Sequence, residues 1–147
     1  GPRPERGADA DPHPMKLLGI DYGQKRIGLA MARNAMAFPF KTLEKSTRDK
    51  LFAELLAIIE AEGVKAIVLG LPLDMNGEET LTTRQVINFR DSLARRTTLP
   101  IHLVNEALTS FDARERLREA GVPQRRHKEM LDQMAAVCIL ETYLENS

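Results

Sequence analysis

The chain has 147 residues, and its 21 basic and 21 acidic residues balance to a formal net charge of zero. This length suits one ordinary domain, and no stretch approaches the roughly 20 apolar residues that a membrane span needs. Because the overall charge is neutral, a nucleic-acid partner can be argued only from local clusters of basic residues. The single cysteine, Cys138, excludes an intrachain disulfide, fits a reducing compartment and lies in an apolar segment that we expect to be core.

Residues 1–14 are rich in Pro, Gly and Ala, and we expect them to form a disordered tail ahead of a single domain over residues 15–147. They have no apolar segment of the kind that a signal peptide requires. Leaving out Arg3 and Arg6 together with Glu5, Asp9 and Asp11 changes 21 basic and 21 acidic residues to 19 and 18. The predicted domain therefore stays close to neutral.

Three strands are predicted first along the chain. The apolar run after Met15, the run IGLAMA after a tight turn, and Phe38–Leu43 have the length and composition of neighbouring strands. A helix follows over 47–62, where apolar residues recur at helical spacing and Gly63 supplies a stop signal.

The second half of the chain alternates strands with helices. AIVLGLP is a buried strand ended by Pro72, and Thr82 with Gln85 resembles a capping box that opens the next helix. IHLV after Pro100 is a strand, a helix is expected from about 109 to 120, and a largely buried helix begins near Lys128. This order predicts an α/β fold whose mixed five-stranded sheet starts with an antiparallel meander and is flanked by helices.

Two acidic residues directly follow predicted strands, at the sheet edge where sites form in folds of this class. Asp21 ends the run LLGI, and Glu106 follows IHLVN. Considered alone, each could equally be a turn, cap or solvated loop residue.

Asp132 is less easily explained as a surface residue, because its neighbours in MLDQMAAVCIL are apolar. An unpaired buried carboxylate costs several kcal/mol, whereas an early helical position returns only about 0.3 to 1 kcal/mol through the helix dipole. A cation would supply the difference. Three carboxylates that converge favour a hard divalent ion, Mg²⁺ or Mn²⁺, and a pair of such ions can promote hydrolysis of a phosphodiester.

The sequence also resembles a known family over residues 17–144. The segments LLGIDYGQKRIGLA, IVLGLPLDMNG, VNEALTSFDARERL and RRHKEMLDQMAAVCILETYL resemble, in order and spacing, the signature blocks of the YqgF family. That family comprises pre-16S rRNA nucleases related to Holliday-junction resolvases, with a ribonuclease-H-like fold. The resemblance implies a metal-dependent nuclease in which Asp21, Glu106 and Asp132 are both the catalytic residues and the metal ligands.

One block departs from the family pattern. Most members have Asp-Glu-Arg where this chain has Asn105, Glu106 and Ala107. If the missing arginine contacts phosphate, this chain is slower or uses another basic residue in its place.

Two basic clusters flank the proposed acids in the sequence. Lys25 and Arg26 follow Asp21, and Arg125, Arg126 and Lys128 precede Asp132. Such residues suit backbone phosphates better than base edges, so we expect them to bind structured nucleic acid, either pre-16S rRNA or branched DNA. We expect this binding to take place in the cytoplasm, with pre-ribosomal particles as a further partner.

Two other functions remain open at this point. GIDYGQKRIG resembles the phosphate-binding hairpin of actin-like ATPases, although the chain is too short for the two domains that close over ATP in those enzymes. The departure at Ala107 also allows a ribosome-assembly protein that binds nucleic acid without cleaving it.

Overall fold

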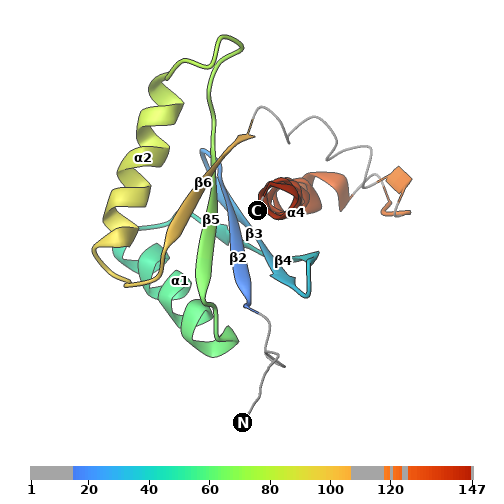
Figure 1. Ribbon diagram of the computed structural model, residues 1–147, viewed down its shortest axis with the longest axis horizontal. Helices are drawn as coiled ribbons and strands as arrows, with labels where there is room; N and C mark the ends of the chain where they lie inside the picture. The colour runs from blue at the N-terminus through green and yellow to red at the C-terminus, as the bar shows by residue number, and fades with distance from the viewer. Residues whose placement is uncertain (1–14, 107–117, 120, 124–125, 147) are drawn as a thin grey trace.

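The computed structural model describes residues 15–106, 118–119, 121–123 and 126–146. Five strands form one sheet in the order β4-β3-β2-β5-β6 (Figure 1). The strands are β2 (Leu17–Tyr22), β3 (Arg26–Arg33), β4 (Met36–Glu44), β5 (Ala66–Leu71) and β6 (Ile101–Asn105). β2, β3 and β4 form an antiparallel meander, while β5 pairs in parallel with β2 and with β6. The predicted mixed sheet is therefore confirmed, with a third strand longer than Phe38–Leu43.

Helices lie on both faces of the sheet (Figure 1). They are α1 (Arg48–Glu62), α2 (Leu81–Ala94) and α4 (His127–Glu145). Among the residues that the structure describes, no helix is long and apolar enough to cross a bilayer. The helix predicted from 109 to 120 falls mostly outside these residues.

The helix ends follow from local sequence, with one correction. Thr47 caps α1 by accepting a hydrogen bond from the Lys50 amide, and Gly63 ends the helix with a φ of 68°. The capping box of α2 is formed by Thr80 and Thr83, so the predicted box at Thr82 and Gln85 is wrong. Both pairs have the required spacing, but Thr80 follows the loop directly and has the extended backbone of a cap residue.

Strand alternation divides the core into two layers. Leu18 and Ile20 of β2 face α1 and α2, whereas Leu17 and Gly19 face α4. Cys138 is buried in the α4 layer, as expected from its apolar neighbours. Consecutive side chains at the carboxyl end of β2 therefore lie on opposite faces of the sheet, one on the α4 side and the next on the side of α1 and α2.

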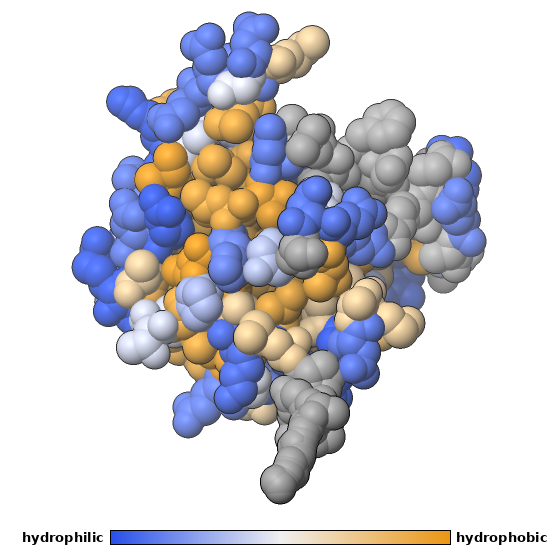
Figure 2. Space-filling view, viewed as in Figure 1, coloured by the Kyte–Doolittle hydropathy of each residue, from blue (hydrophilic) through white to orange (hydrophobic). Residues whose placement is uncertain are grey.

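Strands β4 and β6 are the two edges of the sheet. Figure 2 shows hydrophobic residues near the middle of one face of the molecule, bordered by hydrophilic residues. Leu103 of β6 is 36% exposed, and Met36 and Phe38 of β4 are 59% and 48% exposed. Both edges therefore keep some apolar surface in contact with solvent.

Candidate active site

Asp21 lies near the end of β2 and belongs to the sheet face covered by α4. Its partner across the antiparallel pair is Gly28 of β3. On the other side, Ile20 pairs with Leu69 of β5, which places Gly70 next to Asp21. The half-buried Asp21 is thus flanked by two residues without side chains, which leaves room for other groups above the sheet.

Asp132 reaches this site because α4 rests directly on β3. A Cβ atom added to Gly28 would lie 2.0 Å from the carbonyl oxygen of Asp132, which no real contact allows. Farther along the helix, a Cβ on Gly19 would lie 2.5 Å from Cγ of Leu140 and 3.0 Å from the main-chain oxygen of Ala136. The absence of these side chains brings the second turn of α4 against the strand that neighbours Asp21.

Glu106 occupies the corresponding space on the other side of Asp21. It follows β6 and is half-buried, and a Cβ added to Gly70 would lie 2.5 Å from Cδ1 of Ile139 on α4 and 3.0 Å from Oε1 of Glu106. The carboxylate therefore lies over bare backbone of β5, beside Asp21. Segments that are far apart in the sequence thus place three acidic side chains in a row across β3, β2 and β5.

The three acids are coupled electrostatically. Burial, a side-chain hydrogen bond with Glu106 and the negative charges of Glu106 and Asp132 raise the pKa of Asp21 from its ordinary value of 3.8 to about 9. Asp21 is therefore protonated at neutral pH in the absence of a cation, and it donates a hydrogen bond to Glu106. Such a site has an excess of acceptors for which a cation is the natural partner.

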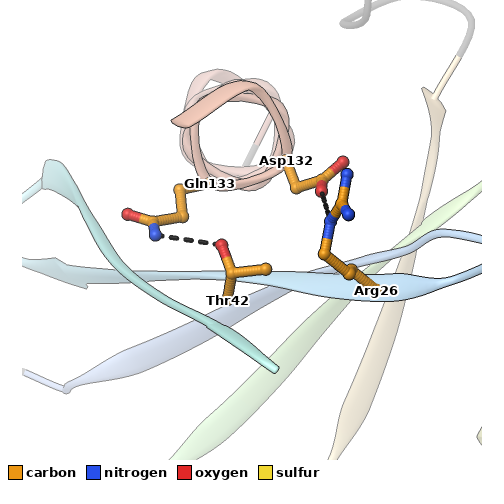
Figure 3. Close-up of polar contacts among 4 residues, drawn as sticks. All are labelled: Arg26, Thr42, Asp132 and Gln133. Carbon is orange, nitrogen blue, oxygen red and sulfur yellow. Dashed lines mark hydrogen bonds and ion pairs between the residues drawn. The ribbon is translucent and has the colours of Figure 1, made fainter. Parts of the chain in front are cut away.

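Asp132 already has a cationic partner, as Figure 3 shows. Nε of Arg26 lies 3.3 Å from Oδ2 of Asp132, and the adjacent Gln133 donates to Oγ1 of Thr42 at 3.0 Å. Asp132 is the sixth residue of α4, beyond the first turn in which the helix dipole acts, and its side chain is 26% exposed. The expectation that Asp132 is a buried residue of the first helical turn is therefore wrong, whereas the cationic partner that it was expected to need is present as Arg26.

The three carboxylates have the chemistry that a divalent cation requires, but their oxygens are not arranged to bind one together. Carboxylate oxygens are the ligands that Mg²⁺ and Mn²⁺ prefer, and the raised pKa of Asp21 reflects unbalanced negative charge. Within the described part of the chain, however, no three His, Cys, Asp or Glu side chains are gathered as a complete metal site. Asp21 and Glu106 are joined to each other, while Asp132 is turned to Arg26.

The basic residues predicted to bind nucleic acid have different positions. Lys25 is exposed in the hairpin after β2, and Arg26 begins β3 and pairs with Asp132. Arg126 is exposed at the start of α4. Lys128 belongs to the first turn of α4, but its side chain is outside the description, as is all of Arg125. Among the described side chains of this set, Arg26 is therefore the one that contacts an acid of the site.

Of the three residues at which the family pattern is compared, the structure describes Asn105 and Glu106. Asn105 is the last residue of β6 and is half-buried, whereas Ala107 lies outside the described residues. Gly28 was not predicted to form part of the site. A glycine inside an apolar strand indicates a close approach of other atoms, and this signal was present at Gly28.

Comparison with known proteins fits this geometry. The profile of the family described as "RuvX: Holliday junction resolvase" matches residues 15–146. The chain belongs to this family. The resemblance to YqgF proteins inferred from the sequence is thereby confirmed.

Two curated relatives carry the name "Putative pre-16S rRNA nuclease". One from Maridesulfovibrio salexigens is 56% identical over 132 residues, which cover 88% of this chain and 98% of the relative. One from Lawsonia intracellularis is 38% identical, with 90% of this chain and 95% of the relative covered.

Solved structures agree on the fold at low sequence identity. RuvC of T. thermophilus in complex with a Holliday junction substrate has a TM-score of 0.57 at 15% identity, covering 90% of this chain and 94% of that one. A fowlpox virus resolvase bound to Holliday junction DNA has a TM-score of 0.55 at 10% identity, with 90% and 98% covered. The expected ribonuclease-H-like fold is therefore confirmed.

Proposed function

We propose that this RuvX/YqgF protein is a divalent-metal-dependent endonuclease that hydrolyses phosphodiesters of structured nucleic acid. The observation that carries the proposal is the row of Asp132, Asp21 and Glu106 over the carboxyl end of the central strands. Gly28 and Gly70 leave room for this row beside Asp21, and the raised pKa of Asp21 reflects its burial next to two other acids. The names of the relatives support the same class of reaction.

In this proposal Asp21, Glu106 and Asp132 hold Mg²⁺ or Mn²⁺ with their carboxylate oxygens. When bound, such ions supply activation of a water molecule for in-line attack on phosphorus and stabilisation of the leaving 3′ oxygen. With a cation held there, Asp21 would be a carboxylate and Asp132 would face the cation instead of Arg26. The Arg26 guanidinium would then be available to a phosphate oxygen, in place of the arginine that is absent at Ala107.

Recognition of the substrate rests on its backbone. We assign phosphate contacts to Lys25 and Arg26 at the hairpin between β2 and β3 and to Arg125, Arg126 and Lys128 near the start of α4. The substrate that we favour is pre-16S rRNA, because the curated relatives are named for it, and within it we propose the 5′ end, free or in pre-ribosomal particles. That substrate would place the protein in the cytoplasm. Branched DNA is the alternative that the family description favours.

The test is a cleavage assay with end-labelled pre-16S rRNA fragments and a four-way DNA junction. Each substrate is incubated with Mg²⁺, with Mn²⁺ or with a chelator. Wild type is compared with Asp21→Asn and with Glu60→Gln, a control that removes a carboxylate from an exposed position on α1. We expect metal-dependent cuts in wild type and in the control, and none in Asp21→Asn.

The substrate that is cut identifies the branch of the family to which the activity belongs. Cuts that persist in Asp21→Asn would exclude the carboxylate mechanism. Binding of either substrate by wild type without any turnover would instead support a non-catalytic assembly protein.

A further inference from the structure

A second feature lies on the opposite face of the sheet from α4. A cavity of about 590 Å³ is bordered by the end of β2, the beginning of α1 and one side of α2. This volume falls within the range of sites for small organic ligands, which is roughly 300 to 1,000 Å³. None of the residues assigned above to the acid site lines it.

The walls of this cavity are basic and contain no acid. Lys45 and Arg48 line it, and no Asp or Glu does. Arg96 lies close by, because its guanidinium carbon is 4.2 Å from the ring centroid of Phe52, a lining residue. Among the described residues, none of these three cations forms an ion pair with a carboxylate. Their charges are therefore available to an anion.

The contacts of these cations hold them in place without neutralising them. Nζ of Lys45 donates to the carbonyl of Gly23 at 2.9 Å and lies 4.0 Å from the ring centroid of Tyr22. Arg48 donates to Oγ of the buried Ser92. Because these partners are neutral, the side chains are preorganised while the positive potential remains.

The remaining lining groups suit a nucleoside better than an apolar ligand. Gln24, Gln85 and Asn88 are exposed, and their side-chain amides can both donate and accept hydrogen bonds. The ring of Phe89 stacks on that of Phe52 at 5.5 Å and contacts that of Tyr22 at 4.4 Å. Because the rings pack on one another and under the cations, the open part of the cavity is polar. Phosphate near the cations and a sugar or base edge near the amides fit this distribution.

The cavity also lies next to the acids along the chain. Asp21 and Tyr22 are consecutive residues of β2, so their side chains lie on opposite faces at the same end of the strand. The hairpin that follows carries Gln24, which lines the cavity, and the exposed Lys25. A polynucleotide that passes over this end of the sheet meets the acids, the hairpin and the cavity in turn.

We propose that this cavity binds one phosphate-bearing nucleotide of the substrate strand, close to the phosphodiester that lies at the acids. The inference rests on the proposed function, which it deepens by requiring an unpaired nucleotide next to the cut. A nucleotide that remains in a duplex cannot enter, because its base is stacked and paired.

The experiment measures binding in the presence of EDTA, so that cleavage does not contribute. The full chain, labelled with ¹⁵N, is titrated with a short single-stranded RNA, with a blunt RNA duplex, and separately with AMP and ATP. The side-chain amide signals of Gln24, Gln85 and Asn88 report on the cavity. Affinity is measured in parallel by fluorescence anisotropy for wild type, Asn88→Glu and the control Ala57→Glu, which adds the same charge at an exposed position of α1 outside the cavity.

We expect the single-stranded RNA to shift the cavity amides in a saturable way and to bind more tightly than the duplex. Asn88→Glu should weaken its binding about tenfold by repelling phosphate, while Ala57→Glu should change it less than about twofold. Unshifted amides with bound RNA, or equal affinities in the two variants, would overturn the proposal. Tighter binding of ATP or AMP than of RNA would also overturn it, in favour of a free-nucleotide site.

Failure here is distinguishable from failure of the proposed nuclease activity. If the nuclease proposal is right and the cavity proposal wrong, Asp21→Asn abolishes cleavage and Asn88→Glu cleaves single-strand-containing substrates like wild type. If the nuclease proposal is wrong, wild type does not cleave, yet the binding measured in EDTA still decides whether RNA occupies the cavity.

Discussion

Replacing Asp21 by asparagine should stabilise the metal-free protein while removing its proposed activity. With an ordinary pKa of 3.8 and a pKa of about 9 in the folded state, Asp21 takes up a proton when the chain folds at pH 7. The full shift would cost about 4 kcal/mol at that pH. Because Asp21 is only half-buried and solvent reduces part of this cost, we expect Asp21→Asn to gain about 1 to 3 kcal/mol in EDTA.

The pH dependence has a defined sign. Since the folded state binds the proton more tightly than the unfolded state, Asp21 makes its full contribution to stability below pH 3.8 and loses it as pH rises toward about 9. Urea unfolding at pH 5, 7 and 8 in EDTA should therefore show a gap between Asp21→Asn and wild type that widens with pH. Glu60→Gln on the exposed side of α1 should show no such trend. An Asn variant that is no more stable than wild type at pH 8 would refute the account of the site.

Three further predictions test the surroundings of Asp21. Titration of Mg²⁺ or Mn²⁺ at pH 7.5 in buffers of different ionisation enthalpy should reveal release of about one proton per bound site, and no release would contradict the protonated state of Asp21. Gly28→Ala should lower the free energy of unfolding by about 1 to 3 kcal/mol and displace Asp132, because the added Cβ meets the α4 backbone. An unchanged urea midpoint would argue against this close contact. Arg26→Gln should cost only about 0.2 to 1 kcal/mol in EDTA, because the ion pair with Asp132 is partly exposed, but should weaken RNA binding. A stability loss far above this range would mean that Arg26 is mainly a structural residue.

Much of the fold could be predicted from the sequence because its signals are local. Apolar runs ended by Asp21 and Pro72 predicted strands that the structure contains, and Thr47 and Gly63 mark the ends of a helix as expected. The capping box of α2 was placed two residues late, because cap spacing alone does not distinguish Thr80 from Thr82. Local chemistry therefore located the elements more reliably than their boundaries.

The arrangement of the site was less predictable because it depends on contacts between distant segments. The pattern identified Asp21, Glu106 and Asp132 as candidates, but not that Arg26 would pair with Asp132 across the sheet. The cavity that includes Tyr22 and Asn88 left no signal in the sequence. Its residues come from separate segments, and each has an ordinary structural explanation by itself.

The contact of α4 with Gly19 and Gly28 bears on how this protein can change during evolution. Where a helix lies directly on strand backbone, there is no intervening layer of side chains to absorb a shift. The distance between Asp132 and Asp21 is then fixed mainly by main-chain contact, so exchanges among large apolar residues elsewhere on α4 alter stability before they alter the spacing of the acids. The other core residues of this fold can therefore be exchanged while the two glycine positions keep the distance between the acidic groups unchanged.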